Sequence, residues 1–406
     1  MEKAWDVAVV GGGAAGLAAA VAAAGGGSSV VLLDRLPRLG KKILATGGGR
    51  CNLSNENLSP AVFSSTSPGL VDSVFGLVGG DDLRVFFQGL GLVLTSEEGR
   101  LYPATQQAAT VVKALELEIS RAGVRVELGF EVQSLNRRGR AFALEAADGR
   151  RLSAKRVVLS AGGKSYPALG SNGSGHELAR RLGHRLIPPV PAAVPLLVKD
   201  PLCQALQGQR IKARASAWVD GLMRGEAGGE ILFASYGLSG TAVLDVSEPV
   251  SVALNREGRK DVVLAADLVP FLSADALRVE LERRERGGWP QNSLATGILP
   301  EKFNPWLSGW LASRHPESGT AASFLAALLK DKRFPVHGTR GWNEAEFTAG
   351  GVAASEVSAS NLESKLFPGL YLAGEILDVQ GPRGGFNLAW AWASGLVAGR
   401  AAAERP

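Results

Sequence analysis

The chain has 406 residues, of which 46% are hydrophobic and 20% charged, so it is globular and long enough for about two or three domains. The net charge is +5, and the basic residues occur as short interspersed pairs such as Lys155-Arg156. This distribution indicates a mildly basic surface, and we expect no nucleic-acid partner. Two cysteines, Cys51 and Cys203, exclude a disulfide framework and fit a reducing cytoplasm. With no signal-peptide pattern, we expect neither export nor membrane insertion.

An apolar strand at 7–10 runs directly into Gly11–Gly16, which has the pattern G-x-G-x-x-G and opens an alanine-rich helix. In such a loop Gly11 permits a tight turn, Gly13 lets backbone N–H groups approach a pyrophosphate, and Gly16 lets helix and strand pack closely. A second strand ends at Asp34, near the offset of about 20 residues expected for a carboxylate that binds ribose hydroxyls. Residues 7–33 carry no charged side chain, as a membrane span would. Their strand, loop and helix pattern instead predicts a βαβ unit that binds a dinucleotide.

A second glycine-rich loop covers 40–55, where three consecutive glycines precede Arg50, Cys51 and Asn52. Backbone amides, a fixed cation and polar side chains on one short segment suit an extended phosphate- or flavin-bearing ligand. A flexible glycine loop without a ligand is the alternative interpretation.

The next stretch predicts alternating helices and strands. We expect helices at 82–89 and 108–122, and extended segments at 91–95, 100–102, 125–128 and 130–132, with a hairpin at 141–151. A buried strand at 156–163 ends on Ala161, Gly162 and Gly163. Ligands of parallel sheets bind outside the carboxyl ends of strands, so these residues are placed to touch one.

Prolines at 188–191 mark a linker, and short β-like pieces follow at 215–219, 229–233, 242–246 and 250–254. Ser273 is placed to cap a helix ending near residue 286, and further helices are expected at 306–311 and 320–330.

The last residues return to a strand, 369–375, that ends on Gly374 and Glu375. Residues 384–387 then start a helix that runs to about residue 403. The free N–H groups of a helix N-terminus suit the anionic pyrimidine end of a reduced flavin.

Taken together, these residues resemble the BaiN/RdsA-like FAD-dependent oxidoreductases, which include aminoacetone-oxidase-like flavoproteins. The motifs that carry the resemblance are G-x-G-x-x-G, TGGGRCNLSN (46–55), AGGKSYP (161–167), YGLSG (236–240), TRG (339–341), TAGGV (348–352) and the segment 371–387.

The resemblance implies an α/β fold, with a Rossmann-like FAD-binding domain of the two-dinucleotide-binding flavoprotein type and an inserted β-barrel-like domain that carries a small helical subdomain. The implied boundaries are 1–190 and 346–406 for the FAD domain, 191–262 and a return strand at 334–345 for the barrel, and 263–333 for the helical subdomain.

The resemblance also implies roles for individual residues. The pyrophosphate and adenosine would be held by Gly11, Gly13, Ala15, Gly16, Asp34, Arg35 and Val132. The flavin side would be lined by Lys42, Gly48, Gly49, Arg50, Cys51 and Asn52. Gly374 and Glu375 would contact the ribityl or pyrophosphate region, and the isoalloxazine would meet Gly385, Asn387 and Leu388. Ser235 and Thr241 depart from the family pattern, which has His and Pro there, so the resemblance by itself does not define the substrate class.

FAD would perform the redox step while the protein binds, orients and manages protons. Arg50 could stabilise the reduced flavin or anchor an acidic substrate, or it could be a phosphate clamp or surface ion pair. Tyr166 and Tyr236 could donate protons, or simply pack with satisfied hydroxyls. Cys51 is more readily a small buried residue than a redox thiol.

The four histidines (His176, His184, His315, His337) are scattered, so no metal is expected. Without a second βαβ fingerprint there is no dedicated nicotinamide domain, and NADPH or NADH would act as a transient electron donor. We expect a small-molecule substrate; the oligomeric state stays open.

Three functions remain open. The first is NAD(P)H-linked reduction of an activated C=C, which the tyrosines and arginine favour. The second is oxidation of a small amine or alcohol with release of hydrogen peroxide. The third is a non-catalytic or RNA-associated flavoprotein.

Overall fold

The computed structural model describes residues 4–313 and 320–404, so His315 lies outside the described residues. The chain divides into two compact units. The first comprises Met1–Pro189 and Phe347–Pro406, and the second is Val190–Glu346. Each unit has its own cluster of buried hydrophobic side chains.

A parallel sheet forms the centre of the first unit. Its order is β7–β2–β1–β10–β19, with β7 (Arg125–Leu128), β2 (Val30–Asp34), β1 (Trp5–Val10), β10 (Arg151–Leu159) and β19 (Leu370–Leu372). The early part of β10 pairs instead with an antiparallel hairpin made of β8 (Val132–Arg138) and β9 (Ala141–Ala146). Residues 7–10 of β1 and 30–33 of β2 are apolar and buried because both faces of a parallel sheet are covered. The hairpin expected at 141–151 is confirmed as the turn from β9 to β10. The expected central strands are also present, but β10 ends at Leu159 and β19 at Leu372, before the small residues that were expected to end them.

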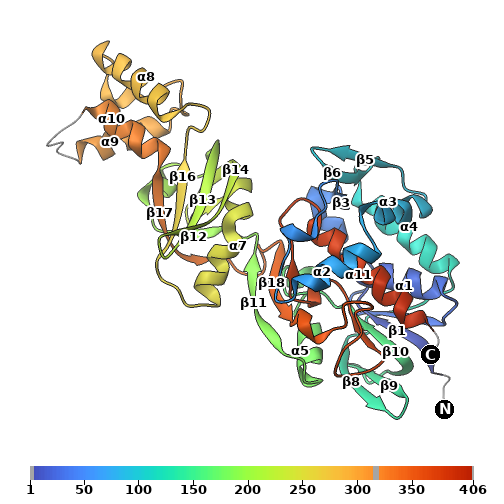
Figure 1. Ribbon diagram of the computed structural model, residues 1–406. Coiled ribbons are helices and arrows are strands. Elements are labelled where there is room, and N and C mark those ends of the chain that lie inside the picture. The colour runs from blue at the N-terminus through green and yellow to red at the C-terminus, as the bar shows by residue number, and fades with distance from the viewer. Residues whose placement is uncertain (1–3, 314–319, 405–406) are drawn as a thin grey trace. The chain divides into compact units, whose positions relative to one another are not determined.

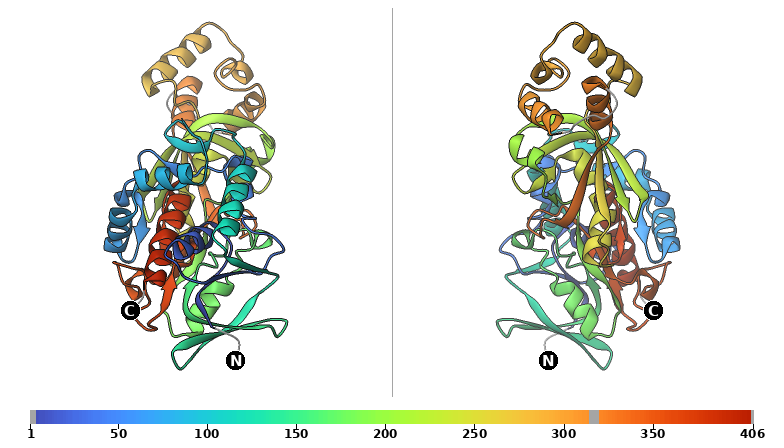
Figure 2. Two further views of the ribbon diagram at one scale, coloured as in Figure 1. Left: turned by 90° about the vertical axis from the view of Figure 1, so that its right-hand side faces the viewer. Right: turned by 90° about the vertical axis from the view of Figure 1, so that its left-hand side faces the viewer.

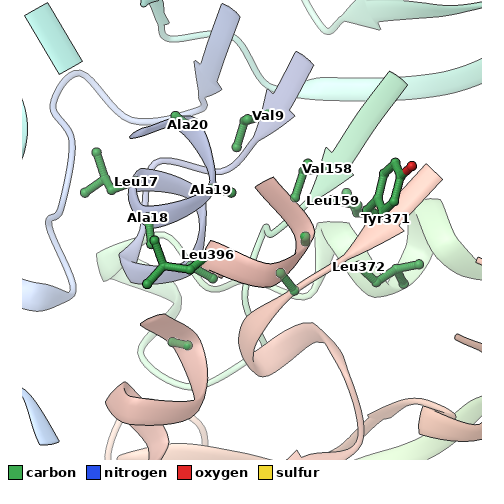
Figure 3. Close-up of a cluster of buried hydrophobic side chains, with 14 of the residues drawn as sticks. Val9, Leu17, Ala18, Ala19, Ala20, Val158, Leu159, Tyr371, Leu372 and Leu396 are labelled. Atoms are coloured by element: carbon green, nitrogen blue, oxygen red, sulfur yellow. The ribbon is translucent and has the colours of Figure 1, made fainter. Parts of the chain in front are cut away.

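Two helices from opposite ends of the chain pack together on this sheet, α1 (Ala14–Gly25) and α11 (Phe386–Ala403), as Figures 1 and 2 show. Glycines permit this approach: a Cβ on Gly395 would lie 2.3 Å from the Ala15 carbonyl oxygen, and one on Gly399 2.3 Å from that of Ala19. Figure 3 shows the apolar cluster that the helices form with the central strands. The tight contact fixes the first turn of α1, where the dinucleotide loop ends.

The rest of the first unit surrounds this centre. Its helices are α2 (Pro68–Leu77), α3 (Gly80–Gly89), α4 (Ala108–Arg121) and α5 (Ser174–Arg181). A small antiparallel sheet contains β3 (Ser54–Asn55), β6 (Arg100–Pro103) and β5 (Leu94–Glu97), and β4 (Ser64–Ser65) pairs with β20 (Val379–Gln380). Another two-stranded sheet, β11 (Leu186–Ala192) with β18 (Phe347–Val352), brings together the points where the chain leaves and re-enters this unit.

The second unit is built on a closed barrel of strands in the order β12–β15–β14–β13–β16–β17. Their bounds are β12 (Leu196–Val198), β15 (Gly237–Ser239), β14 (Leu222–Ala234), β13 (Arg210–Val219), β16 (Val262–Asp267) and β17 (Lys332–Thr339). Neighbouring strands are antiparallel, and side chains of β13 alternate between buried and exposed. Closure leaves no free sheet edge.

One secondary-structure prediction in this unit is wrong. The segments 242–246 and 250–254, expected as short strands, belong to a single helix, α7 (Thr241–Asn255), with Pro249 inside it. Its buried residues follow the helical repeat: Ala242, Val243, Val246, Ser247, Val250, Ser251 and Ala253. Packing of this apolar stripe against the barrel outweighs the β-propensity of valine and the loss of one backbone N–H at proline.

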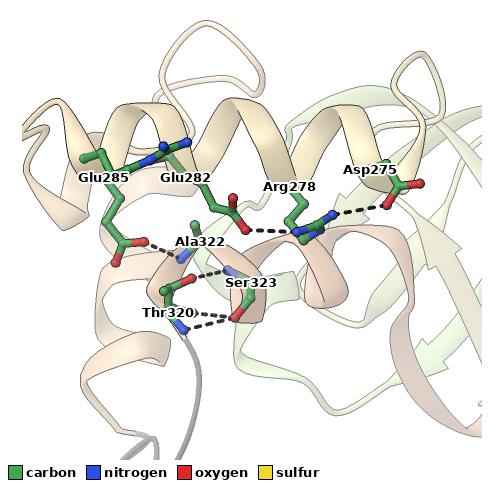
Figure 4. Close-up of polar contacts among 8 residues, drawn as sticks. Asp275, Arg278, Glu282, Glu285, Thr320, Ala322 and Ser323 are labelled. Atoms are coloured by element: carbon green, nitrogen blue, oxygen red, sulfur yellow. Dashed lines mark hydrogen bonds and ion pairs between the residues drawn. The ribbon is translucent and has the colours of Figure 1, made fainter.

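Three helices form a subdomain on the barrel: α8 (Ala274–Arg286), α9 (Phe303–Ala312) and α10 (Ala321–Lys330). Figure 4 shows how α8 and α10 are joined, with the Glu285 carboxylate accepting from the Ala322 N–H at 3.3 Å. Thr320 and Ser323 complete a capping box at the start of α10. The expected helices of this segment are confirmed, as is the cap of α8 by Ser273.

Among the helices of residues 4–313 and 320–404, none combines the length and apolar character needed to cross a bilayer. Within the same residues, no three His, Cys, Asp or Glu side chains gather in a way that could hold a metal ion.

Candidate cofactor site

The loop between β1 and α1 is shaped by its glycines. Gly11 has φ +107°, and a Cβ there would lie 2.6 Å from the Ser160 carbonyl oxygen at the end of β10. A Cβ on Gly16 would lie 1.7 Å from the Gly11 oxygen, so this position admits only glycine. A Cβ on Gly13 would meet nothing within 4 Å, which leaves open space beside the helix N-terminus. A pyrophosphate fits such a space.

Asp34, at the end of β2, is anchored by the same loop. Its Oδ2 accepts from the Gly12 N–H at 2.6 Å and its Oδ1 from the Leu36 N–H at 2.7 Å. Burial raises the pKa of this carboxyl above its usual value, although the two N–H bonds oppose the rise. Each oxygen keeps a lone pair, so the side chain can still accept a bond from a ribose hydroxyl.

The residues expected around the adenosine come together next to Asp34. Arg35 pairs with Glu131, with Nε and Oε1 3.2 Å apart, and the Phe130 N–H donates to the Asp34 carbonyl oxygen. Val132 begins β8 directly after this contact and is buried. Glu131 was not expected from the sequence, where it is one more charge in an extended segment.

The second glycine-rich loop has the backbone that its sequence requires. Gly47, Gly48 and Gly49 all have positive φ, and Cys51 also adopts φ +62°, a rare conformation for a residue with a side chain. Non-glycine residues held in this region are found preferentially at functional sites. A Cβ on Gly48 would meet nothing within 4 Å, so this part of the loop borders open space.

The start of α11 packs against this loop. A Cβ on Gly385 would lie 2.4 Å from the Ser54 carbonyl oxygen and 2.7 Å from Asn52 Oδ1. Both Asn52 Oδ1 and Ser54 Oγ are buried and have no hydrogen-bond partner among the described residues. Asn387 holds the loop before the helix by bonds to Gly381, at 2.9 Å to its N–H and 2.8 Å to its carbonyl oxygen. Buried polar atoms of this kind call for a bound partner.

A charged cluster lies at the carboxyl ends of β10 and β19. Lys42 Nζ donates to Glu375 Oε2 and to Ser165 Oγ, both at 2.7 Å. Glu375 Oε1 accepts from Ser165 Oγ at 2.9 Å and from the Thr348 N–H at 2.8 Å. Burial by itself would raise the pKa of Glu375, but the charge and hydrogen bonds of these partners hold it below its usual value. Ser165 and Thr348 were not singled out from the sequence.

His176, in the first turn of α5, is buried beside this cluster. Its Nε2 has no hydrogen-bond partner among the described residues, and the ring bonds the backbone of Ile376. Burial lowers the pKa of His176, while the nearby Glu375 charge partly opposes that shift. The glycine-rich turn before α5 is the one feature of the sequence near His176 that stands out.

Arg50 and Cys51 differ in their surroundings. Arg50 pairs with Glu97 at 2.8 Å, donates to the Tyr102 hydroxyl at 3.2 Å and lies over the Tyr102 ring. Cys51 is fully buried, and that burial raises the pKa of its thiol to about 12. Its thiol is therefore protonated at neutral pH.

The two tyrosines belong to different units. Tyr166 lies in the first unit, directly before Pro167, and has φ +52°, which is strained for a tyrosine. Tyr236 lies in the second unit, where Arg340 is stacked on its ring with 4.8 Å between the guanidinium carbon and the ring centroid. This contact joins the YGLSG and TRG motifs within the barrel.

The structure thus brings most of the expected residues of the first unit into three connected groups. These are the pyrophosphate loop with Asp34, the second loop with the start of α11, and the Lys42–Glu375 cluster. Gly374 links the first and third, because a Cβ there would lie 2.7 Å from the Ala15 Cβ. Ala161 and Gly162 follow β10 between them, and a Cβ on Gly11 would lie 2.9 Å from the Ala161 Cα. Open space at Gly13 and Gly48 and the unpartnered Asn52 and Ser54 oxygens fit a long dinucleotide that spans these groups.

A parallel Rossmann-type sheet with this loop and these groups defines an FAD-dependent oxidoreductase. Residues 5–401 match the family described as HI0933-like protein Rossmann domain, and the chain belongs to that family.

Two curated relatives are similar over nearly the whole chain. The 3-dehydro-bile acid delta(4,6)-reductase of Clostridium scindens is 38% identical over 387 residues, 92% of this chain and 93% of the relative. The ribosomal RNA dihydrouridine synthase of Escherichia coli is 30% identical over 382 residues, 90% of this chain and 89% of the relative.

Among solved structures, the open conformation of a flavocytochrome c3 fumarate reductase is similar with a TM-score of 0.50 and 16% identity, over 99% of this chain and 78% of that one. At this identity the likeness concerns the fold alone. It is the fold of a flavoprotein, in agreement with the α/β architecture expected from the sequence.

Proposed function

We propose that this protein reduces an activated C=C bond, conjugated to a carbonyl group, in a steroid-like small molecule. The observation that carries the proposal is the 38% identity, over nine-tenths of both chains, to a 3-dehydro-bile acid delta(4,6)-reductase. FAD supplies hydride transfer in this chemistry, and NADPH or NADH would reduce it in a transient encounter.

The chain's own residues would bind the substrate and move a proton. Addition of hydride to one carbon of an enone places negative charge on the carbonyl oxygen, and the neighbouring carbon then takes a proton. Tyr166 and Tyr236 are our candidates for that proton donor. Both remain candidates, because Tyr166 has a strained backbone of the kind found at functional sites and Tyr236 has the Arg340 cation stacked on its ring. Arg50, our first candidate for charge stabilisation, is already paired with Glu97, which favours a structural role for it.

The electron donor is tested by an anaerobic titration of the purified protein with NADPH and then NADH, followed by flavin absorbance. We expect bleaching by one nicotinamide and slow recovery when air is admitted. Bound FAD that neither nicotinamide bleaches would contradict the proposed donor. Fast recovery in air, with hydrogen peroxide release from an amine or alcohol, would favour the oxidase alternative.

A second candidate function concerns RNA, because a 30% identical relative is named ribosomal RNA dihydrouridine synthase. Reduction of a C=C bond in a base uses the same hydride chemistry with a macromolecular substrate. Salt-sensitive binding of ribosomal RNA, measured by filter retention or fluorescence anisotropy, distinguishes the two. Tight salt-dependent binding together with no turnover of steroid enones would favour this candidate.

A further inference from the structure

We propose that Lys42, held in place by Glu375 and Ser165, is the charged side chain that tunes the redox equilibrium of bound FAD. The inference concerns the cofactor alone and does not depend on which substrate is reduced. It also assigns to Lys42 a role for which the sequence offered Arg50 as one candidate.

The first argument is the way Lys42 is held. An ammonium group has three N–H donors, and two of them are used by Ser165 Oγ and Glu375 Oε2, both at 2.7 Å. Its side chain is 24% exposed and that of Glu375 is 21% exposed, so neither is fully enclosed by protein. The remaining donor and part of the charge are available to a ligand.

The second argument is the rigidity of the support. Ser165 is fully buried and donates to Glu375 Oε1, which also accepts from the Thr348 N–H. Thr348 Oγ1 in turn accepts from the Lys164 and Ser165 N–H groups at 2.8 and 3.2 Å. Segments far apart in the sequence thus fix one ammonium group, which is more support than a surface ion pair has.

The third argument is where the cluster lies. Gly163, just after β10, would place a Cβ 2.4 Å from Thr348 Oγ1 and 3.0 Å from Glu375 Cδ. Glu375 directly follows Gly374, which contacts the first turn of α1 at Ala15. The cluster is therefore at the carboxyl edge of the parallel sheet and next to the dinucleotide loop, where cofactors of such sheets bind.

Arg50 lacks these properties. Its nitrogens bond Glu97, Gln106, Tyr102 and the Gly47 carbonyl oxygen, at distances between 2.8 and 3.5 Å. Its side chain is 41% exposed and that of Glu97 is 48% exposed, so solvent screens the pair. An arginine engaged in this way stabilises the small sheet that carries Glu97 and Tyr102.

The sign of the effect can be tested because the pair has one charge of each kind. A cation near a flavin favours the reduced, more negative state, and an anion disfavours it. Lys42→Met should therefore make FAD harder to reduce, and Glu375→Gln, which leaves Lys42 without its counter-charge, should make it easier to reduce. A pair that acts only as a structural clamp would not give shifts of opposite sign.

The experiment measures the midpoint potential of the FAD-loaded protein by equilibration with a reference dye, together with the dissociation constant for FAD. We expect Lys42→Met to shift the ratio of reduced to oxidised flavin at least tenfold toward oxidised, about 30 mV for a two-electron couple. Lys42→Arg should have a midpoint potential close to that of the wild type because it keeps the positive charge. Lys41→Met is the matched control, since the neighbouring Lys41 carries the same charge, is equally half-buried, and donates to the Ala168 carbonyl oxygen outside the cluster.

Equal potentials for wild type, Lys42→Met and Glu375→Gln would overturn the inference, as would a large shift for Arg50→Met with none for Lys42→Met. If Lys42→Met fails to retain FAD, the inference is tested by the easier reduction expected for Glu375→Gln and by a potential near that of the wild type for Lys42→Arg. Absence of enone reduction by a wild type with normal potentials would instead contradict the proposed function and leave this inference standing.

Discussion

At the scale of single residues, the clearest prediction concerns Gly13. Gly13→Val should abolish FAD binding, because the new side chain would fill the open space where the pyrophosphate is expected, while meeting no protein atom within 4 Å. The fold should survive. FAD content per protein after purification, with circular dichroism, checks both statements.

Gly25→Val is the control for that variant. Gly25 ends α1 and would also place its Cβ in open space, but away from the loop, so full FAD content is expected. A Gly13→Val protein that retained a full complement of FAD would disprove our interpretation of the loop.

His176 should make stability depend on pH. Burial lowers the pKa of His176 below the usual 6.5. As the pH falls below about 6.5, this histidine is therefore protonated in the unfolded chain but stays neutral in the folded chain. The free energy of unfolding should then fall by up to about 1.4 kcal/mol per pH unit from this group, and the contribution is fully present above that pH. Urea unfolding at pH 7.5 and 5.5 measures it.

His176→Gln should flatten this dependence, whereas the same change at the exposed His337 should not. If the pH dependence of unfolding were unaltered in His176→Gln, the histidine would not be the titrating group. If His176→Gln lowered the free energy of unfolding equally at pH 7.5 and 5.5, the change would reflect lost packing and not the titration of His176.

At the scale of elements, the contact between α1 and α11 gives two opposite outcomes for one chemical change. Gly399→Ala should destabilise the protein by about 1–3 kcal/mol, because its Cβ would press on the Ala19 carbonyl oxygen. Gly76→Ala, in the exposed face of α2 with open space around it, should stabilise by up to about 1 kcal/mol. Thermal unfolding of the two variants measures both changes in stability. Stabilisation by both would mean that α1 and α11 can move apart at Gly399 without loss of stability.

The elements also show what the sequence can and cannot predict. The first βαβ unit was predictable because strand, glycine loop, helix and acidic residue are consecutive in sequence. Helix α7 was not, since Pro249 divides its apolar stripe into two short runs that look like strands. Only Lys42 and Glu375 of the charged cluster were predicted from the sequence. The members come from four separate segments of the chain, and nothing local marks Ser165 or Thr348 as partners of Glu375.

At the scale of the whole molecule, two separate hydrophobic clusters and the pairing of β11 with β18 suggest that the first unit can fold without the second. Replacing residues 193–346 by a short Gly-Ser linker should give a monodisperse protein that binds FAD, because every cofactor contact we propose lies in the first unit. An aggregated or colourless product would show that the barrel unit is needed for the cofactor site. Enone reduction should be lost if Tyr236 is the proton donor.

The central claim, that this flavoprotein delivers hydride to an activated C=C bond, is tested most directly by one measurement. FAD bound to the protein is reduced photochemically without oxygen, a 3-oxo-4-ene or 3-oxo-4,6-diene steroid is added, and flavin absorbance is followed while the steroid product is identified by mass. We predict stoichiometric reoxidation with a gain of two hydrogens by the steroid. Flavin that stays reduced with these steroids and with simpler enones, yet reoxidises quickly in air, would contradict the account.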